Sequence, residues 1–144
     1  MRRTIAALIA SLVVCCGGDF LWLGIVARDF YASRLGALLR PEPYWVPALL
    51  FYALYACGLL LFCVTPALAA GSWRKALGMG TLLGLVAYAT YDLSNLATLQ
   101  GWPVAVTIAD IAWGMGISGL AALAGYAAAV ASMRPVERPG RAPQ

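Results

Sequence analysis

Residues 84–98 read GLVAYATYDLSNLAT, a polar stretch inside a long apolar segment. In a helix, positions i, i+4, i+7, i+8 and i+11 of this stretch share one face, which carries Gly84, Tyr88, Tyr91, Asp92 and Asn95. An unpaired polar group in a lipid-like environment costs about 2–7 kcal/mol. This face therefore cannot lie against lipid tails, and other helices must supply partners for it.

The composition places the chain among membrane proteins. Of its 144 residues, 62% are hydrophobic and 11% are charged, and the mean hydropathy is +0.81. Ordinary soluble domains contain about 25% charged residues. The net charge of +4 comes from single basic residues between apolar segments, a pattern typical of membrane topology and anionic headgroups rather than of nucleic-acid binding. The bilayer is the expected partner, and no nucleic-acid partner is expected.

Histidine is absent from the sequence, which excludes haem ligation by His and His-based acid–base chemistry. The four cysteines all fall within apolar runs and form no Cys-x-x-Cys pair, so we interpret them as small buried hydrophobic residues. No cofactor is expected. Whether a metal binds is left open by the sequence.

Four apolar runs predict transmembrane helices over residues 4–27, 45–70, 76–99 and 104–132, each long enough to cross a hydrocarbon layer of about 30 Å. The predicted fold is an all-α membrane protein, a compact up-down bundle of four helices. An apolar stripe within residues 28–44 predicts a short interfacial helix between the first two. Pro66 is expected to kink or end the second helix, and Gly71–Lys75 to form a tight basic turn.

Residues 1–133 are expected to form one transmembrane domain, and the Pro- and Arg-rich residues 134–144 a disordered cytoplasmic tail. The first apolar run is longer than a signal-peptide core of about 7–15 residues, so we expect it to stay uncleaved. The positive-inside rule places both termini in the cytoplasm, because seven Arg and Lys residues flank that side and three flank the other. The seven are Arg2, Arg3, Arg74, Lys75, Arg134, Arg138 and Arg141, and the three are Arg28, Arg34 and Arg40.

Three acidic residues lie within different spans, and all three fall at a similar depth. At about 1.5 Å per residue, Asp19, Asp92 and Asp110 reach the outer half of the bilayer. Aromatic residues on the four helices reach the same layer. The candidate residues for a ligand or ion site are therefore Asp19, Trp22, Tyr52, Tyr55, Tyr88, Tyr91, Asp92, Asn95, Asp110 and Trp113.

Two short motifs each occur twice. Asp-x-x-Trp occurs at Asp19 and at Asp110, and Tyr-x-x-Tyr occurs at Tyr52 and at Tyr88. Their mirrored order along the chain indicates quasi-symmetry, although the helix directions do not match a simple tandem duplication. Gly80 and Gly84 form a Gly-x-x-x-Gly step, which predicts close approach of a neighbouring helix.

The acids can be interpreted in two ways. A mid-span Asp costs about 2.5–3.5 kcal/mol on insertion scales, and no Arg or Lys lies in the spans at that depth. Such carboxyl groups must protonate, share protons, accept hydrogen bonds or hold a cation. One interpretation is a polar knot that fixes helix register. The other is a functional pocket, which we favour because intramembrane acids usually mark a substrate, ion or proton path.

Five segments carry a resemblance to a known family. They are DFLWLG at 19–24, FYALY at 51–55, YATYDLSNLA at 88–97, WP at 102–103 and DIAWG at 110–114. The chain resembles the bacterial membrane-protein family catalogued as domain of unknown function 2177 over nearly its whole length. The resemblance implies a small four-helix protein of the inner membrane and brings no established activity.

Three functional hypotheses follow. The first is an acidic and aromatic pocket in the outer half of the bilayer that binds or transports a cation, a proton-coupled solute or a small lipid-like ligand. The second is a membrane-embedded enzyme or accessory acting on lipids, and the third is a structural subunit of a membrane complex. The sequence leaves open whether the protein is an enzyme and whether it forms a homodimer.

Overall fold

The computed structural model describes residues 1–133, which fold into helices joined by short connections. The first span is α1 (Arg2–Leu21) continued by the π-helix η1 (Trp22–Val26), and the third and fourth spans are α5 (Trp73–Thr98) and α6 (Val104–Ala131). The second span combines α3 (Trp45–Gly58), the π-helix η3 (Leu59–Val64) and α4 (Thr65–Ala69). All four are long and apolar enough to cross a membrane, so the predicted four-helix, all-α fold is confirmed.

The short helix between the first two spans is also present. It consists of α2 (Arg28–Leu35) and one 3-10 turn, η2 (Gly36–Leu38). Gly36 ends α2 with φ of 49°, a left-handed conformation that favours glycine. The buried residue of α2 is Tyr31, which turns inward toward the bundle.

The turn before α5 is shorter than expected. The side chain of Ser72 accepts a hydrogen bond from the backbone N–H of Lys75 at 3.3 Å and so caps the helix. Trp73, Arg74 and Lys75 therefore form the first turn of α5, not part of the connection. The turn itself is made by Gly71, with φ of 60°, and Ser72.

Pro66 neither ends nor breaks the second span. Proline has no N–H to donate to the carbonyl four residues earlier, so it frees a backbone acceptor. The preceding residues relax into the π-helix η3, and the Thr65 hydroxyl donates to the Leu60 carbonyl at 2.8 Å. The helix then continues as α4, with Pro66 in its first turn.

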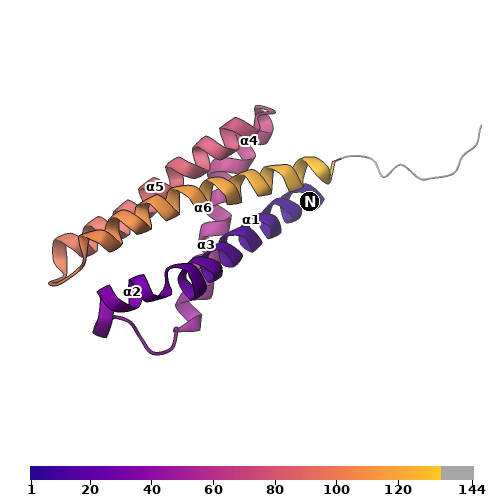
Figure 1. Ribbon diagram of the computed structural model, residues 1–144. Coiled ribbons are helices and arrows are strands. Elements are labelled where there is room, and N and C mark those ends of the chain that lie inside the picture. The colour runs from indigo at the N-terminus through magenta and orange to yellow at the C-terminus, as the bar shows by residue number, and fades with distance from the viewer. Residues whose placement is uncertain (134–144) are drawn as a thin grey trace, which may run out of the picture.

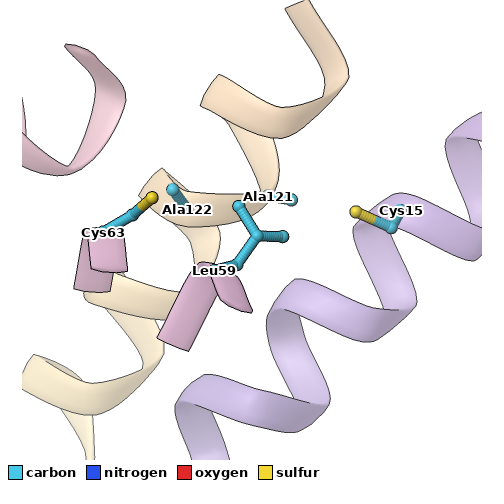
Figure 2. Packing of buried hydrophobic residues seen from close by; sticks show 5 residues of the cluster. All are labelled: Cys15, Leu59, Cys63, Ala121 and Ala122. Atoms are coloured by element: carbon cyan, nitrogen blue, oxygen red, sulfur yellow. The ribbon is translucent and has the colours of Figure 1, made fainter. Parts of the chain in front are cut away.

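The bundle is organised around α6. This helix packs along α5 on one side and α1 on the other, whereas α3 and α4 cross them at a steep angle (Figure 1). In the centre, Leu59 and Cys63 lie against Ala121 and Ala122 of α6, with Cys15 of α1 opposite (Figure 2). Small residues line this core, so the helix backbones come close together.

The contact between α5 and α6 is the most extensive in the bundle. A Cβ atom built on Gly80 would lie 2.6 Å from the Ser118 carbonyl oxygen, and one built on Gly84 would meet the Gly114 carbonyl. Both glycines are buried, and the atoms nearest to each position belong to the backbone and small side chains of α6. The close approach predicted from the Gly-x-x-x-Gly step is therefore confirmed.

Candidate functional site

A cavity of about 730 Å³ lies where α1, α2, α3, α5 and α6 meet. Its wall carries three charged residues among aromatic and aliphatic side chains. The charged residues are Asp19, Arg28 and Asp110; the aromatic ones are Tyr31, Phe51, Tyr52, Tyr88, Tyr91, Trp102 and Trp113; and the aliphatic ones are Leu23, Ala32, Leu35, Leu39 and Ala87. The cavity is therefore mostly apolar, with a few polar groups that converge from different helices.

Asp19 is held by two aromatic donors. The Trp113 indole Nε1 donates to its Oδ1 at 2.8 Å, and the Tyr52 hydroxyl donates to its Oδ2 at 3.0 Å. These donors come from α6 and α3, so the carboxyl group of α1 joins three spans. Only 7% of Asp19 is exposed, and that exposed edge lies on the cavity wall.

The two Asp-x-x-Trp motifs face each other in a crossed arrangement. The rings of Trp22 and Trp113 stack with their centroids 4.7 Å apart. Trp113 of the second motif donates to Asp19 of the first. In return, Trp22 of the first motif donates to the Tyr31 hydroxyl at 3.1 Å, and Tyr31 donates to Asp110 of the second motif. The repeated motif thus corresponds to a physical pairing of α1 with α6.

Tyr31 is a site residue that our sequence interpretation placed only on an apolar stripe. Burial, and then the hydrogen bond to Asp110, raise the pKa of its phenol, so the hydroxyl keeps its proton and acts as a donor. An apolar stripe in the α2 sequence can contain either Phe or Tyr, so the stripe alone does not indicate that the Tyr31 hydroxyl has a role. Three intramembrane acids need hydrogen-bond donors, and this need could have singled out Tyr31, because its phenol can donate and a Phe side chain cannot.

Asp92 does not line the cavity, in contrast to the other two acids. Its side chain is fully buried, and within residues 1–133 neither carboxyl oxygen has a hydrogen-bond partner. The antiparallel register of α5 and α6, which brings Gly84 to Ser118 and Tyr88 to Gly114, brings Asp92 opposite Asp110. Two carboxyl groups therefore lie opposite each other on α5 and α6, and only that of Asp110 lines the cavity.

The remaining candidates divide between the cavity and other places. Tyr88 lines the cavity with its ring packed against Gly114, and Tyr91 lines it in edge contact with Trp102, the ring centroids 5.9 Å apart. Tyr55 points away and shares a hydrogen bond of 2.6 Å with the Ser118 hydroxyl. Asn95 is half-buried and lies outside the cavity.

The cavity wall also includes aromatic and basic residues absent from the candidates drawn from the sequence. Phe51 and Trp102 add apolar surface, and Arg28, at the start of α2, brings a cation to the wall. Among residues 1–133, no group of three or more His, Cys, Asp or Glu side chains is arranged to hold a metal ion. The site is best described as an apolar cavity with two carboxyl groups and one guanidinium.

The comparison with protein families agrees with this architecture. The model of the family DUF2177, described as a predicted membrane protein, matches residues 4–127. The chain belongs to this family. No curated protein and no solved structure matches the chain. As a DUF2177 member it is a multi-pass helical membrane protein, and its buried Asp19 is bound by aromatic donors.

Proposed function

We propose that the cavity binds a small molecule with a cationic head and an apolar body, taken from the surrounding membrane. The observation that carries the proposal is the pair of carboxyl groups, Asp19 and Asp110, on the wall of an otherwise aromatic and aliphatic cavity. A pocket of several hundred Å³ with few polar groups suits a small ligand. The carboxyl groups of the wall thus suit a cationic head, and its aromatic and aliphatic side chains suit a hydrocarbon body.

The polar groups favour a cation over an anion. Asp19 accepts one hydrogen bond on each oxygen, and Asp110 accepts one from Tyr31, so both carboxyl groups retain free lone pairs. Arg28 offsets only one of the two negative charges. The faces of Tyr, Phe and Trp rings also attract cations, especially quaternary ammonium groups.

The cavity wall includes side chains on the outer surface of the bundle, which favours a ligand that enters from the bilayer. Several wall residues are also exposed on the outer surface of the bundle, including Leu23, Leu39, Phe51 and Tyr91. In a membrane, the surface around these side chains faces lipid. A ligand with a hydrocarbon body can therefore enter sideways, without crossing the bundle.

The orientation of the bundle in the membrane can be inferred from the positions of its basic residues. Arg2 and Arg3 begin α1, and Arg74 and Lys75 begin α5, at the end of the bundle opposite to α2 and the cavity. The positive-inside rule puts these residues in the cytoplasm. We infer that the cavity lies in the outer half of the bilayer of a bacterial inner membrane.

This topology has a direct test. A reporter enzyme that is active only in the cytoplasm is expected to work when inserted between Gly71 and Ser72, and to be silent when inserted at Pro41. A periplasmic reporter at the same two positions should give the opposite result and serves as the control. Activity of the cytoplasmic reporter at Pro41 would put the cavity in the inner half of the bilayer.

Binding can be tested with dodecyltrimethylammonium, followed by tryptophan fluorescence in dodecyl maltoside. The detergent supplies the same chain on an uncharged head, so any saturable signal reports the cation. We expect Asp19→Asn to weaken binding about tenfold or more. Unit charges about 4 Å apart attract by about 4 kcal/mol at an effective dielectric constant of about 20, and tenfold corresponds to about 1.4 kcal/mol.

The matched control is Asp29→Asn, which removes an exposed carboxylate of α2 outside the cavity. It should bind as the wild type does. Equal affinity in Asp19→Asn and wild type would contradict the proposal and favour the polar knot.

Native mass spectrometry of the protein taken directly from its membrane separates two ligand sources. An amine-bearing phospholipid retained by wild type and lost in Asp19→Asn indicates a lipid, and an empty wild type indicates a free amphiphile.

A further inference from the structure

Asp92 and Asp110 form a pair of carboxyl groups, and the buried member, Asp92, has no part in the proposed cation binding. Asp110 lies on the cavity wall, whereas Asp92 does not line the cavity and has no exposed surface. Both oxygens of Asp92 lack a hydrogen-bond partner within the described residues 1–133. A buried carboxylate without partners is too costly to persist as an ion, and two adjoining carboxylates make the cost larger.

Within residues 1–133, the side chains that face the pair carry carboxyl and phenol groups, and neither Asp92 oxygen has a hydrogen-bond partner. Asp110 on α6 lies opposite Asp92 in the α5–α6 register, and Tyr31 on α2 donates to Asp110. From α1, Asp19 adds a further carboxyl near Asp110. Tyr52 of α3 donates to Asp19, and Tyr88 and Tyr91 of α5 bring phenol groups to the cavity wall.

Arg28, the cation of the cavity wall, leaves both Asp92 oxygens unpartnered. One proton shared between the two carboxyl groups satisfies the pair.

We propose that a cation entering the cavity displaces the proton held by the Asp92–Asp110 pair, so that the protein exchanges one proton for one ligand. This rests on the proposed function. The O–H bond of the protonated carboxyl group breaks, its electron pair stays on the carboxylate oxygen, and the proton leaves through the cavity to water. One positive charge enters and one leaves, so the charge of the site is conserved.

The exchange makes cation affinity depend on pH. A proton and a cation compete for the same pair of carboxyl groups, so by linkage each must weaken the binding of the other. Cation affinity should rise by up to about tenfold for each pH unit while the empty site still holds its proton. A polar knot without exchange predicts no such slope.

The test is calorimetric titration with dodecyltrimethylammonium at one pH, in phosphate and in Tris. These buffers differ in ionisation enthalpy, so the difference in apparent heat counts the protons released. The ligand is a quaternary ammonium ion with no proton of its own, and every proton must therefore come from the protein. We expect release of about one proton per ligand in the wild type and in Asp29→Asn.

Asp92→Asn provides the decisive comparison. The amide keeps the size of the side chain and can donate to Asp110, which leaves Asp110 ionised before the ligand arrives. This variant is expected to bind the cation without proton release, with affinity that no longer changes with pH and that exceeds the wild-type affinity at low pH. Such a gain cannot come from misfolding. Asp92→Ser, which also donates without ionising, is the second variant if Asp92→Asn does not fold.

The outcomes separate the two proposals. Binding by the wild type without proton release, or unchanged release in Asp92→Asn, overturns the exchange and leaves the binding cavity standing. An absence of binding in the wild type, already visible in the fluorescence titration, overturns both.

Discussion

Gly84→Ala is expected to lower the free energy of unfolding by about 3 kcal/mol, at the upper end of the about 1–3 kcal/mol usual for overpacking. The new methyl group would meet the carbonyl of Gly114 and lie 2.7 Å from the Ser118 hydroxyl. Neither neighbour can yield easily. One is helix backbone, and the other is held by the Tyr55 hydroxyl at 2.6 Å. The α5–α6 contact, the most extensive in the bundle, must therefore open.

Thermal or denaturant unfolding of the purified protein in detergent measures this effect. Gly78→Ala is the matched control on the same helix, because a Cβ atom at Gly78 meets nothing within 4 Å. Gly116→Ala provides the same control on α6. Both controls should be neutral or slightly stabilising, since alanine favours helix over glycine. Equal stability of Gly84→Ala and Gly78→Ala would mean that α5 and α6 are less closely packed than described.

The spans could be predicted from the sequence because length and hydropathy largely determine them. Four runs of apolar residues are sufficient to define four crossings of a membrane. The start of α5 could not be predicted in the same way. It depends on one hydrogen bond, from the Lys75 N–H to the Ser72 side chain, and a Gly-Ser-Trp-Arg-Lys segment fits a turn equally well. The effect of Pro66 likewise depends on a local choice, the π-helix η3, that hydropathy does not report.

The site shows the same division. Depth along each helix predicts that Asp19, Asp92 and Asp110 lie in a common layer, and the structure places Asp19 and Asp110 on the wall of one cavity. Depth does not determine which way a side chain points, and the structure places Tyr55 and Asn95 outside the cavity. Tyr31 and Trp102 reach the wall from the short helix and the last connection, where helical periodicity gives no information on tertiary contacts. Sequence patterns within the spans therefore do not predict which residues of the connections line the cavity.

Asp19→Leu is expected to help membrane insertion and to destabilise the inserted fold. On insertion scales, leucine gains about 0.3–0.6 kcal/mol where aspartate costs about 2.5–3.5, so the variant should reach the membrane at least as well as the wild type. In the folded bundle, however, the Trp113 indole and the Tyr52 hydroxyl both lose their acceptor. Both donors are half-buried, and a hydrogen bond lost from such a group costs about 0.5–1.5 kcal/mol, which gives about 1–3 kcal/mol for the two.

The two effects are measured separately, as the amount of protein in the membrane fraction and as resistance to unfolding after purification. Phe20→Leu, which changes the neighbouring side chain that is 75% exposed, should alter neither quantity. A double-mutant cycle with Tyr52→Phe isolates one of the two bonds, and we expect a coupling of about 0.5–3 kcal/mol. If Asp19→Leu proves as stable as the wild type, the donors do not depend on the carboxyl group. Asp19 would then be a group that the bundle holds for the ligand alone.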